Sequence, residues 1–269
     1  MVEPYWEFVS QLETAAIDFP GFMGVSVKDL STGDEHHING DERFLAASSI
    51  KVPILIELFR KAGAGAVDLD EGITVSDEVK VGGTGVLKEF GDGTATLSIG
   101  DLASLMVTVS DNTATNIIID IVGFDDVNAL LEGMGLTTTR LLRKMQDSVA
   151  SSQGRENYAT PREFMAMMDR LYSSEGLDPW VCERTLEYLS KPKTTAINRL
   201  LPYNLRVASK YGNMRDSYSD IGIVYHPERP YILAVMAREI PEDDIRKQGI
   251  IDEISKISKM TYDHFDFLS

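Results

Sequence analysis

The sequence has one cysteine, Cys182, and few positively charged residues for its size. A single cysteine excludes an internal disulfide. The 269 residues include 26 lysines and arginines against 42 aspartates and glutamates, which gives a net charge of −16. Such a chain should repel nucleic acid and anionic membrane surfaces, so we predict neither as a partner. A lysine inside a cleft can still bind an anionic small molecule.

Long apolar segments are also lacking. No run approaches the roughly 20 residues that a membrane span needs. The segment from Met1 to Pro20 has neither a basic start nor an unbroken apolar core, so we predict no secretory signal and expect a cytoplasmic protein. The four histidines show no spacing that is typical of a metal site.

Apolar residues make up 43% of the chain, which is enough for a sizeable core. Periodicity and turn residues predict strands near both ends of the chain and helices elsewhere. The predicted strands cover residues 22–30, 35–39, 206–212, 218–225 and 231–238. The predicted helices cover residues 3–17, 48–61, 98–109, 112–122, 125–133, 160–172 and 179–189, and a last helix from Pro241 to about Met260.

This order of elements predicts an α/β (α+β) fold. Strands from both chain ends should form one five-stranded antiparallel sheet, with the terminal helices packed on it and the central helices in a second, all-helical lobe. We expect a single domain, 1–269, with a sheet lobe of residues 1–45 and 200–269 and a helical lobe of residues 46–199. A cleft between such lobes would be the natural place for a site.

Ser48-Ser49-Ile50-Lys51 is an S-x-x-K motif at the predicted start of a helix. A serine hydroxyl is a poor nucleophile until a nearby base takes its proton, and a lysine can be that base when burial or neighbouring charge lowers its pKa. The motif predicts Ser48 as nucleophile and Lys51 as general base. Taken alone, the motif is equally compatible with a serine that caps the helix and a lysine that faces solvent.

Ser110-Asp111-Asn112 follows an apolar helical segment. A serine or aspartate at this place can simply cap the next helix. In an S-D-N motif, Ser110 would relay a proton to a leaving group, and Asn112 would offer its amide to Lys51 and to the substrate. Asp111 would bind backbone amides of the turn.

Lys210-Tyr211-Gly212 lies in a predicted strand and is an imperfect K-T-G motif. Lys210 could bind a substrate carboxylate, and Gly212 would let a ligand lie close to the backbone. The backbone N–H groups of Ser48 and Asn213 would form an oxyanion hole. The three motifs in this order favour the catalytic interpretation over three unrelated structural ones.

With these motifs the chain resembles class A β-lactamases and the wider penicillin-recognising serine hydrolases. The resemblance extends over nearly the whole chain, and includes the segments at residues 44–53, 105–116, 157–161 and 220–224. It implies a β-lactamase/transpeptidase-like fold, an acyl-enzyme on Ser48 formed with a β-lactam, ester or amide, and no metal or organic cofactor. Tyr211 would then belong to the substrate-binding residues, with Asn112, Lys210 and Gly212.

The chain departs from this family at two places. The Ω-loop glutamate that activates the deacylating water should fall near Lys144, Met145 or Gln146, none of which is an acid. Deacylation should therefore be slow, unless Asp147 or Glu156 replaces the missing base.

The second departure is Tyr211, which replaces a small hydroxyl residue. It predicts weaker carboxylate recognition and a smaller or more aromatic pocket, although strand alternation should direct Tyr211 away from Lys210. Gly82-Gly83-Thr84-Gly85 lacks a following Gly-Lys-Ser/Thr, so it predicts a loop at the edge of the site and no phosphate-binding motif.

Three functions remain open from the sequence. The chain can be a serine hydrolase of the β-lactamase-like family acting on a small molecule, with a small cytosolic ester, amide or lactam as the preferred target. It can be a penicillin-binding-like protein that captures ligands with little turnover. A non-catalytic relative is the third interpretation, which the retained motif residues disfavour.

Overall fold

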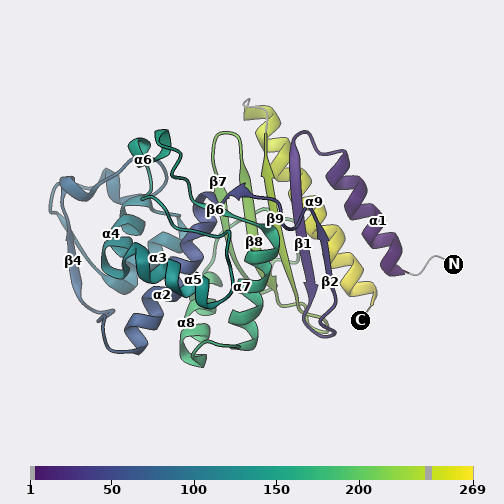
Figure 1. Cartoon of the computed structure of the whole chain (residues 1–269), viewed down its shortest axis with the longest axis horizontal. Helices are drawn as coiled ribbons and strands as arrows, with labels where there is room; N and C mark the ends of the chain where they lie inside the picture. Colours follow the sequence, from purple (N-terminus) through teal and green to yellow (C-terminus); the bar gives the residue numbers. More distant parts are fainter. Residues whose placement is uncertain (1–3, 240–243, 269) are drawn as a thin grey trace. The chain divides into compact units, whose positions relative to one another are not determined.

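The computed structural model describes residues 4–239 and 244–268. It contains the predicted five-stranded antiparallel sheet, and its strand order is β2-β1-β9-β8-β7 (Figure 1). The strands are β1 (Phe22–Asp29), β2 (Glu35–Ile38), β7 (Val207–Asn213), β8 (Tyr218–Val224) and β9 (Tyr231–Arg238). Strands from the two chain ends meet where β1 pairs with β9, from Phe22 opposite Arg238 to Asp29 opposite Tyr231.

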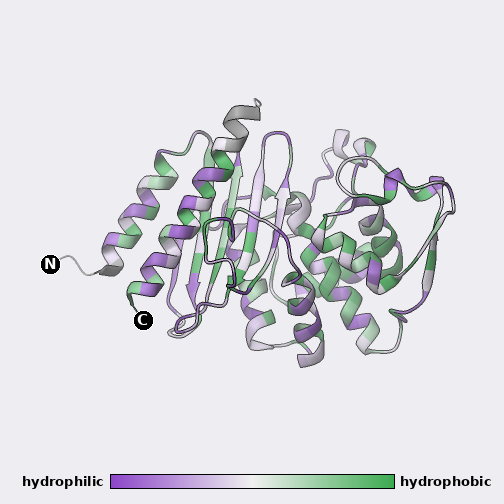
Figure 2. Ribbon diagram, turned by 180° about the vertical axis from the view of Figure 1, so that it is seen from behind, coloured by the Kyte–Doolittle hydropathy of each residue, from purple (hydrophilic) through white to green (hydrophobic). Residues whose placement is uncertain are grey.

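Two helices cover one face of this sheet: α1 (Pro4–Ile17) and α9 (Asp244–Phe267), which lie side by side (Figure 1). Hydrophilic and hydrophobic segments alternate along both helices in Figure 2, as expected for helices with one buried face. Their apolar residues, including Leu12 and Ile254, join inward residues of the strands in one core. α9 continues past the predicted end at Met260, and the predicted start at Pro241 lies outside the described residues.

The chain divides into two compact units. The first, the sheet unit, comprises the described parts of residues 1–49, 158–169 and 194–269, and the second, the helical unit, comprises residues 50–157 and 170–193. The S-x-x-K segment runs from one into the other, because Ser49 is the last residue of its stretch in the sheet unit and Ile50 the first in the helical unit.

The helical unit is built mainly from α2 to α6 and α8. Their bounds are α2 (Lys51–Gly63), α3 (Ile99–Thr108), α4 (Asn112–Val122), α5 (Phe124–Gly133), α6 (Ser148–Ser152) and α8 (Pro179–Leu189). α7 (Pro161–Ser173) begins in the sheet unit and ends in the helical unit. α4 packs against α2 and α3, and most of its residues are buried.

The structure corrects the predicted start of the second helix. α2 begins at Lys51, and Ser48 lies before it in a 3₁₀ turn, Ala47–Ile50. Pro53 is tolerated as the third residue of α2, because the first N–H groups of a helix have no partner within it. The sequence analysis also missed two short pairs of strands. They are β3 (Phe44–Leu45) with β6 (Tyr158–Ala159), and β4 (Gly72–Val75) with β5 (Ala95–Ser98).

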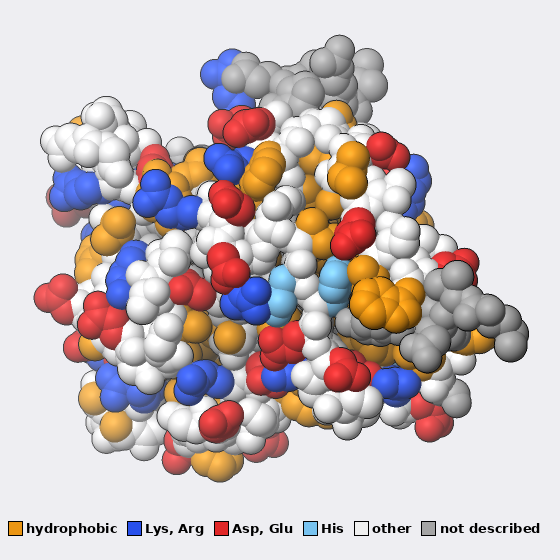
Figure 3. All heavy atoms as spheres, turned by 45° about the vertical axis from the view of Figure 1, so that its right-hand side comes forward, with side chains coloured by type: hydrophobic (Ala, Val, Ile, Leu, Met, Phe, Trp, Pro, Cys, Tyr) orange, Lys and Arg blue, Asp and Glu red, His pale blue; other side chains and the backbone are white. Residues whose placement is uncertain are grey.

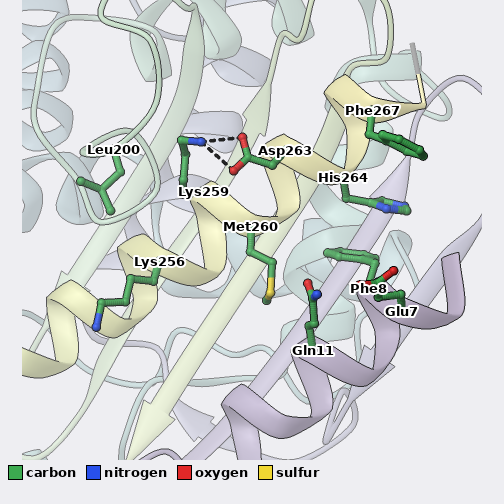
Figure 4. Close-up of a pocket in the computed structure, with 10 residues that line it drawn as sticks. All are labelled: Glu7, Phe8, Gln11, Leu200, Lys256, Lys259, Met260, Asp263, His264 and Phe267. Carbon is green, nitrogen blue, oxygen red and sulfur yellow. Dashed lines mark hydrogen bonds and ion pairs between the residues drawn. The ribbon is translucent and has the colours of Figure 1, made fainter. Parts of the chain in front are cut away.

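The surface of the sheet unit has a hollow of about 510 Å³ between α1 and α9 (Figure 4). Phe8 and His264 stack there with ring centroids 4.1 Å apart, and Lys259 pairs with Asp263. None of the predicted site residues lines this hollow. Acidic and basic side chains are interspersed on the face shown in Figure 3. Within the described residues, no helix combines the length and apolar character required to span a membrane.

Candidate active site

In the sheet unit, the turn that carries Ser48 is fixed to the sheet through its neighbour Ser49. Ser49 is buried, its Oγ donates to the Lys210 carbonyl at 3.1 Å, and it lies 2.8 Å from Ser219 Oγ. Ser219 Oγ in turn donates to the Ala46 carbonyl at 3.0 Å. Because Ser49 is enclosed by these contacts while Ser48 is partly exposed, Ser48 is the serine of this pair that a ligand can reach.

Gly212 allows the Ser48 turn to lie directly against β7. A Cβ atom at Gly212 would be only 2.6 Å from the Ser48 backbone nitrogen, and 2.7 Å from both Ala47 Cβ and Ser219 Oγ. Any larger residue would therefore displace the turn. Asn213, the other predicted oxyanion residue, follows Gly212 as the exposed last residue of β7.

Lys210 is fully buried on the edge strand β7, and its Nζ donates to the Tyr211 carbonyl at 2.7 Å. The same ammonium group lies 4.6 Å from the centroid of the Tyr211 ring. Such a contact stabilises a positive charge over an aromatic face.

The Tyr211 ring packs against the core under α1 and α9 and stacks on Tyr218, with centroids 6.4 Å apart. Burial, together with the nearby Asp220 carboxylate, raises the pKa of the Tyr211 phenol. Gly212 faces Ser219 on the other side of the sheet, so the Tyr211 ring does not occupy the space beside Ser48. The role of Tyr211 in substrate binding stays a prediction.

In the helical unit, Lys51 binds the S-D-N segment. Its buried Nζ donates to the Ser110 carbonyl at 2.7 Å, to Ser110 Oγ at 3.0 Å and to Asn112 Oδ1 at 3.0 Å. A buried ammonium needs such acceptors, because removing an ion from water without new partners costs roughly several kcal/mol. The structure thus brings together Lys51, Ser110 and Asn112.

Asp111 fixes the glycine-rich loop next to this network. One carboxylate oxygen accepts from Ala114 N at 2.9 Å and caps α4. The other accepts from Val86 N at 2.6 Å and Leu87 N at 2.9 Å. Gly85 lies so close to Asp111 that a Cβ on it would be 2.3 Å from the carboxylate. The predicted structural role of Asp111 agrees with these contacts, whereas its hold on the 82–87 loop was not visible in the sequence.

Six non-glycine residues of the described chain have left-handed backbone conformations, and three of them lie before Ser48, in the S-D-N motif and in the segment expected to carry the water-activating acid. The φ angles are +48° at Ala47, +54° at Ser110 and +63° at Gln146. Non-glycine residues adopt this region at a cost of about 1–3 kcal/mol, and such strain tends to gather at functional sites. Nothing in the residue types alone would have pointed to it.

The segment that should carry the water-activating acid is fixed by an amide. Asn116 Nδ2 donates to the Met145 carbonyl at 3.1 Å, and Met145 N donates to Asn116 Oδ1 at 2.8 Å. The next residue, Gln146, directs its side chain toward Gly83, as does Asn112. Their amide nitrogens lie 2.6 and 2.5 Å from the point that a Cβ on Gly83 would occupy. Amides are therefore found where the resemblance leads one to expect a carboxylate.

The two acids that could replace the missing base are engaged elsewhere. Asp147 caps α6 by accepting from Ala150 N at 2.8 Å. Glu156 accepts from Arg143 Nε at 2.8 Å and from Ser151 Oγ. Both carboxylates thus hold their own loop together. Among the residues that the structure describes, no group of three or more histidine, cysteine or acidic side chains is placed to hold a metal ion.

Comparison with known proteins shows the family of this chain. Residues 7–265 match the model of the beta-lactamase enzyme family. The beta-lactamase VEB-1 of Pseudomonas aeruginosa is 24% identical over 253 residues, which are 88% of this chain and 84% of that protein. The carbapenem-hydrolyzing beta-lactamase KPC of Klebsiella oxytoca is 24% identical over 249 residues, 90% of this chain and 84% of that protein.

Solved structures show the same fold. A beta-lactamase from Sphaerobacter thermophilus is 30% identical, with a TM-score of 0.83 over 94% of this chain and 96% of its own. PBP-A is 28% identical, with a TM-score of 0.85 over 97% of this chain and 96% of its own.

The sheet topology and these matches define the β-lactamase/transpeptidase fold. Because the family model matches nearly the whole chain, the chain belongs to the beta-lactamase enzyme family, as a class A β-lactamase-like serine hydrolase. Membership in this family implies a small-molecule substrate.

Proposed function

We propose that this serine hydrolase forms an acyl-enzyme on Ser48 with a β-lactam, ester or amide, and that it releases the acyl group slowly. The observation that carries the proposal is that the buried Lys51 Nζ binds Ser110 Oγ and Asn112 Oδ1. Ser48 lies three residues before Lys51 in the sequence, is partly exposed, and has its backbone nitrogen against Gly212. These contacts support Lys51 as the base that a serine nucleophile needs.

In the acylation step, Lys51 acts as a neutral amine, after its ammonium has lost one proton to solvent. It takes the proton of Ser48 Oγ, which attacks the carbonyl carbon of the substrate. The Ser48 N–H, with that of Asn213, stabilises the negative charge that develops on the carbonyl oxygen. The bond from the carbonyl carbon to the leaving nitrogen or oxygen then breaks. Ser110 Oγ delivers its proton to that atom and takes one from Lys51 Nζ, 3.0 Å away, which returns Lys51 to the neutral amine. Lys210 supplies positive charge for a substrate carboxylate.

Slow deacylation follows from the missing carboxylate at residues 144–146. Water must attack the ester carbonyl of acyl-Ser48, and general-base assistance to such a step is worth about 10²–10⁴-fold. Met145 and Gln146 provide no base, while Asp147 and Glu156 are bound to Ala150 N and Arg143. The acyl-enzyme should therefore accumulate.

The test is the intact mass of the protein over time after mixing with benzylpenicillin. We expect a lasting adduct of one penicillin on the unmodified protein and on Ser49→Ala, and none on Ser48→Ala. Met145→Glu or Gln146→Glu should shorten the lifetime of the adduct, by about 10²-fold if the new carboxylate reaches the water. Rapid turnover without an adduct would contradict slow deacylation, and labelling of Ser48→Ala would contradict the assigned nucleophile.

A second candidate function is stoichiometric ligand capture with little or no turnover. It is favoured by the same amide-lined segment and by the similarity to PBP-A. A point mutant of PBP-A, 27% identical to this chain, was solved as an acyl-enzyme complex with penicillin G. An adduct that persists for days and a product yield of one per protein would support capture over catalysis.

A further inference from the structure

We propose that Thr84, which belongs to none of the three motifs, is a positioning residue for the acylation step. This inference rests on the proposed function of Ser48, Lys51 and Ser110. Thr84 lies in the glycine-rich loop of the helical unit and is exposed, yet its Oγ1 turns inward and donates to the Ser110 carbonyl at 2.8 Å. A threonine hydroxyl on an exposed loop would otherwise bind water.

The Ser110 carbonyl is a shared acceptor. It receives the Thr84 hydroxyl at 2.8 Å and the Lys51 ammonium at 2.7 Å. Two donors on one carbonyl fix its direction, because each must align with one of its lone pairs. Thr84 Oγ1 also lies 3.5 Å from Asn112 Oδ1, the other oxygen that binds Lys51. Thr84 thereby touches both groups that hold the proposed base.

Ser110 needs such support because its backbone is strained. Its φ of +54° is unfavourable for a residue with a side chain, and it persists only when surrounding contacts determine it. Thr84 contributes twice, since its carbonyl also accepts from Asn112 N at 3.0 Å. The threonine thus holds the S-D-N turn on both sides of Asp111 and keeps Ser110 Oγ 3.0 Å from Lys51.

The loop itself does not depend on the Thr84 hydroxyl. Asp111 holds Val86 and Leu87 through their N–H groups, and Asn112 Nδ2 donates to the Gly82 carbonyl at 3.1 Å. Thr84→Val, which keeps the shape and removes the hydroxyl, should therefore leave the loop folded. A change in activity would then report on Ser110 and not on unfolding.

The experiment measures the rate constant of acylation by benzylpenicillin and the dissociation constant of the noncovalent complex separately. Protein and penicillin are mixed rapidly at several penicillin concentrations, quenched with acid, and analysed by intact-protein mass. We expect Thr84→Val to slow acylation about fivefold to tenfold, the effect of one ordinary hydrogen bond, with little change in binding. Thr84→Ser should restore the rate, because it keeps the hydroxyl.

Thr113→Val is the matched control. Thr113 Oγ1 also ties this loop to the S-D-N region, but through the backbone of Val81: it accepts from Val81 N at 3.1 Å and donates to the Val81 carbonyl at 3.4 Å. Its loss should leave acylation nearly unchanged. Equal slowing in Thr113→Val and Thr84→Val, or failure of Thr84→Ser to restore the rate, would overturn the proposal in favour of a general role of the loop.

A crystal structure of Thr84→Val gives a readout that does not depend on the substrate. We expect the Ser110 carbonyl to turn away from Lys51 Nζ and φ of Ser110 to leave the left-handed region. An unchanged Ser110 would overturn the proposal. If the unmodified protein takes up no penicillin, the proposed function fails, while this structure still decides whether Thr84 positions Ser110.

Discussion

The two units hold their motif residues by different means. In the sheet unit, the Ser48 turn is fixed by close approach, since Gly212 lies against the Ser48 nitrogen and Ser49 is buried against Ser219. In the helical unit, the motif residues are held by side-chain hydrogen bonds to Lys51, Asp111 and Asn112. Steric fit tolerates no added atom, whereas a hydrogen-bond network tolerates changes of shape but no loss of a donor or acceptor.

The difference predicts opposite sensitivities. In the sheet unit, a change that adds volume should be damaging even when it is chemically bland. In the helical unit, a change that keeps volume but removes a polar atom should be damaging. The following three predictions test this contrast, from the largest expected effect to the smallest.

Gly212→Ala should have the largest effect. The new Cβ would lie 2.6 Å from the Ser48 nitrogen, so the turn must move, and with it the N–H that we propose for the oxyanion hole. We expect acylation to fall more than tenfold and the free energy of unfolding to fall by about 1–3 kcal/mol, as for other overpacked sites. Penicillin labelling and urea denaturation measure the two effects. Gly133→Ala, at a helical glycine with open space around it, is the control and should lower neither.

Asp111→Asn should have an intermediate effect. It keeps the volume of the side chain but leaves at least one of the N–H groups of Val86, Leu87 and Ala114 without an acceptor. A buried donor without a partner costs about 1–3 kcal/mol, which urea denaturation would detect. The exposed Asp101→Asn is the control. Equal stability of the two variants would show that the loop is not held by the carboxylate.

Acidification should have the smallest effect and should act on the sheet unit. All four histidines belong to it, and burial lowers the pKa of His36, His37 and His264 below 6.5. The unfolded chain then binds protons first as the pH falls through 6.5, so the stability of the folded state decreases below that pH.

Hydrogen exchange at about pH 7.5 and about pH 5.5, corrected for intrinsic rates, would measure this stability loss in each unit. We expect protection to decrease in β2 and α9 and to change little in α4. His36→Gln should reduce the difference in β2. An equal decrease in α4 would contradict a separate pH response of the sheet unit.

The sequence alone determined the elements whose signals are local. α4 begins after Asp111 and α8 begins at Pro179, directly after Asp178, as predicted, because each aspartate accepts a backbone N–H of the helix that it precedes. The strands of the sheet were equally predictable, since alternation and short turns are encoded within each segment. The order and spacing of Ser48, Lys51 and Ser110 are also properties of the chain, so the sequence could propose these residues for the site, and their catalytic roles stay a prediction.

Tertiary structure decided what depends on partners far apart in the sequence. The pair β4 and β5, whose strands are short and separated by a long connection, carried no local signal that predicted them. The left-handed conformation of Ser110, the contact of Thr84 with its carbonyl and the use of Glu156 by Arg143 likewise arise only when the chain is folded. A residue's type states which hydrogen bonds it can make, but only the fold determines which partner lies within reach.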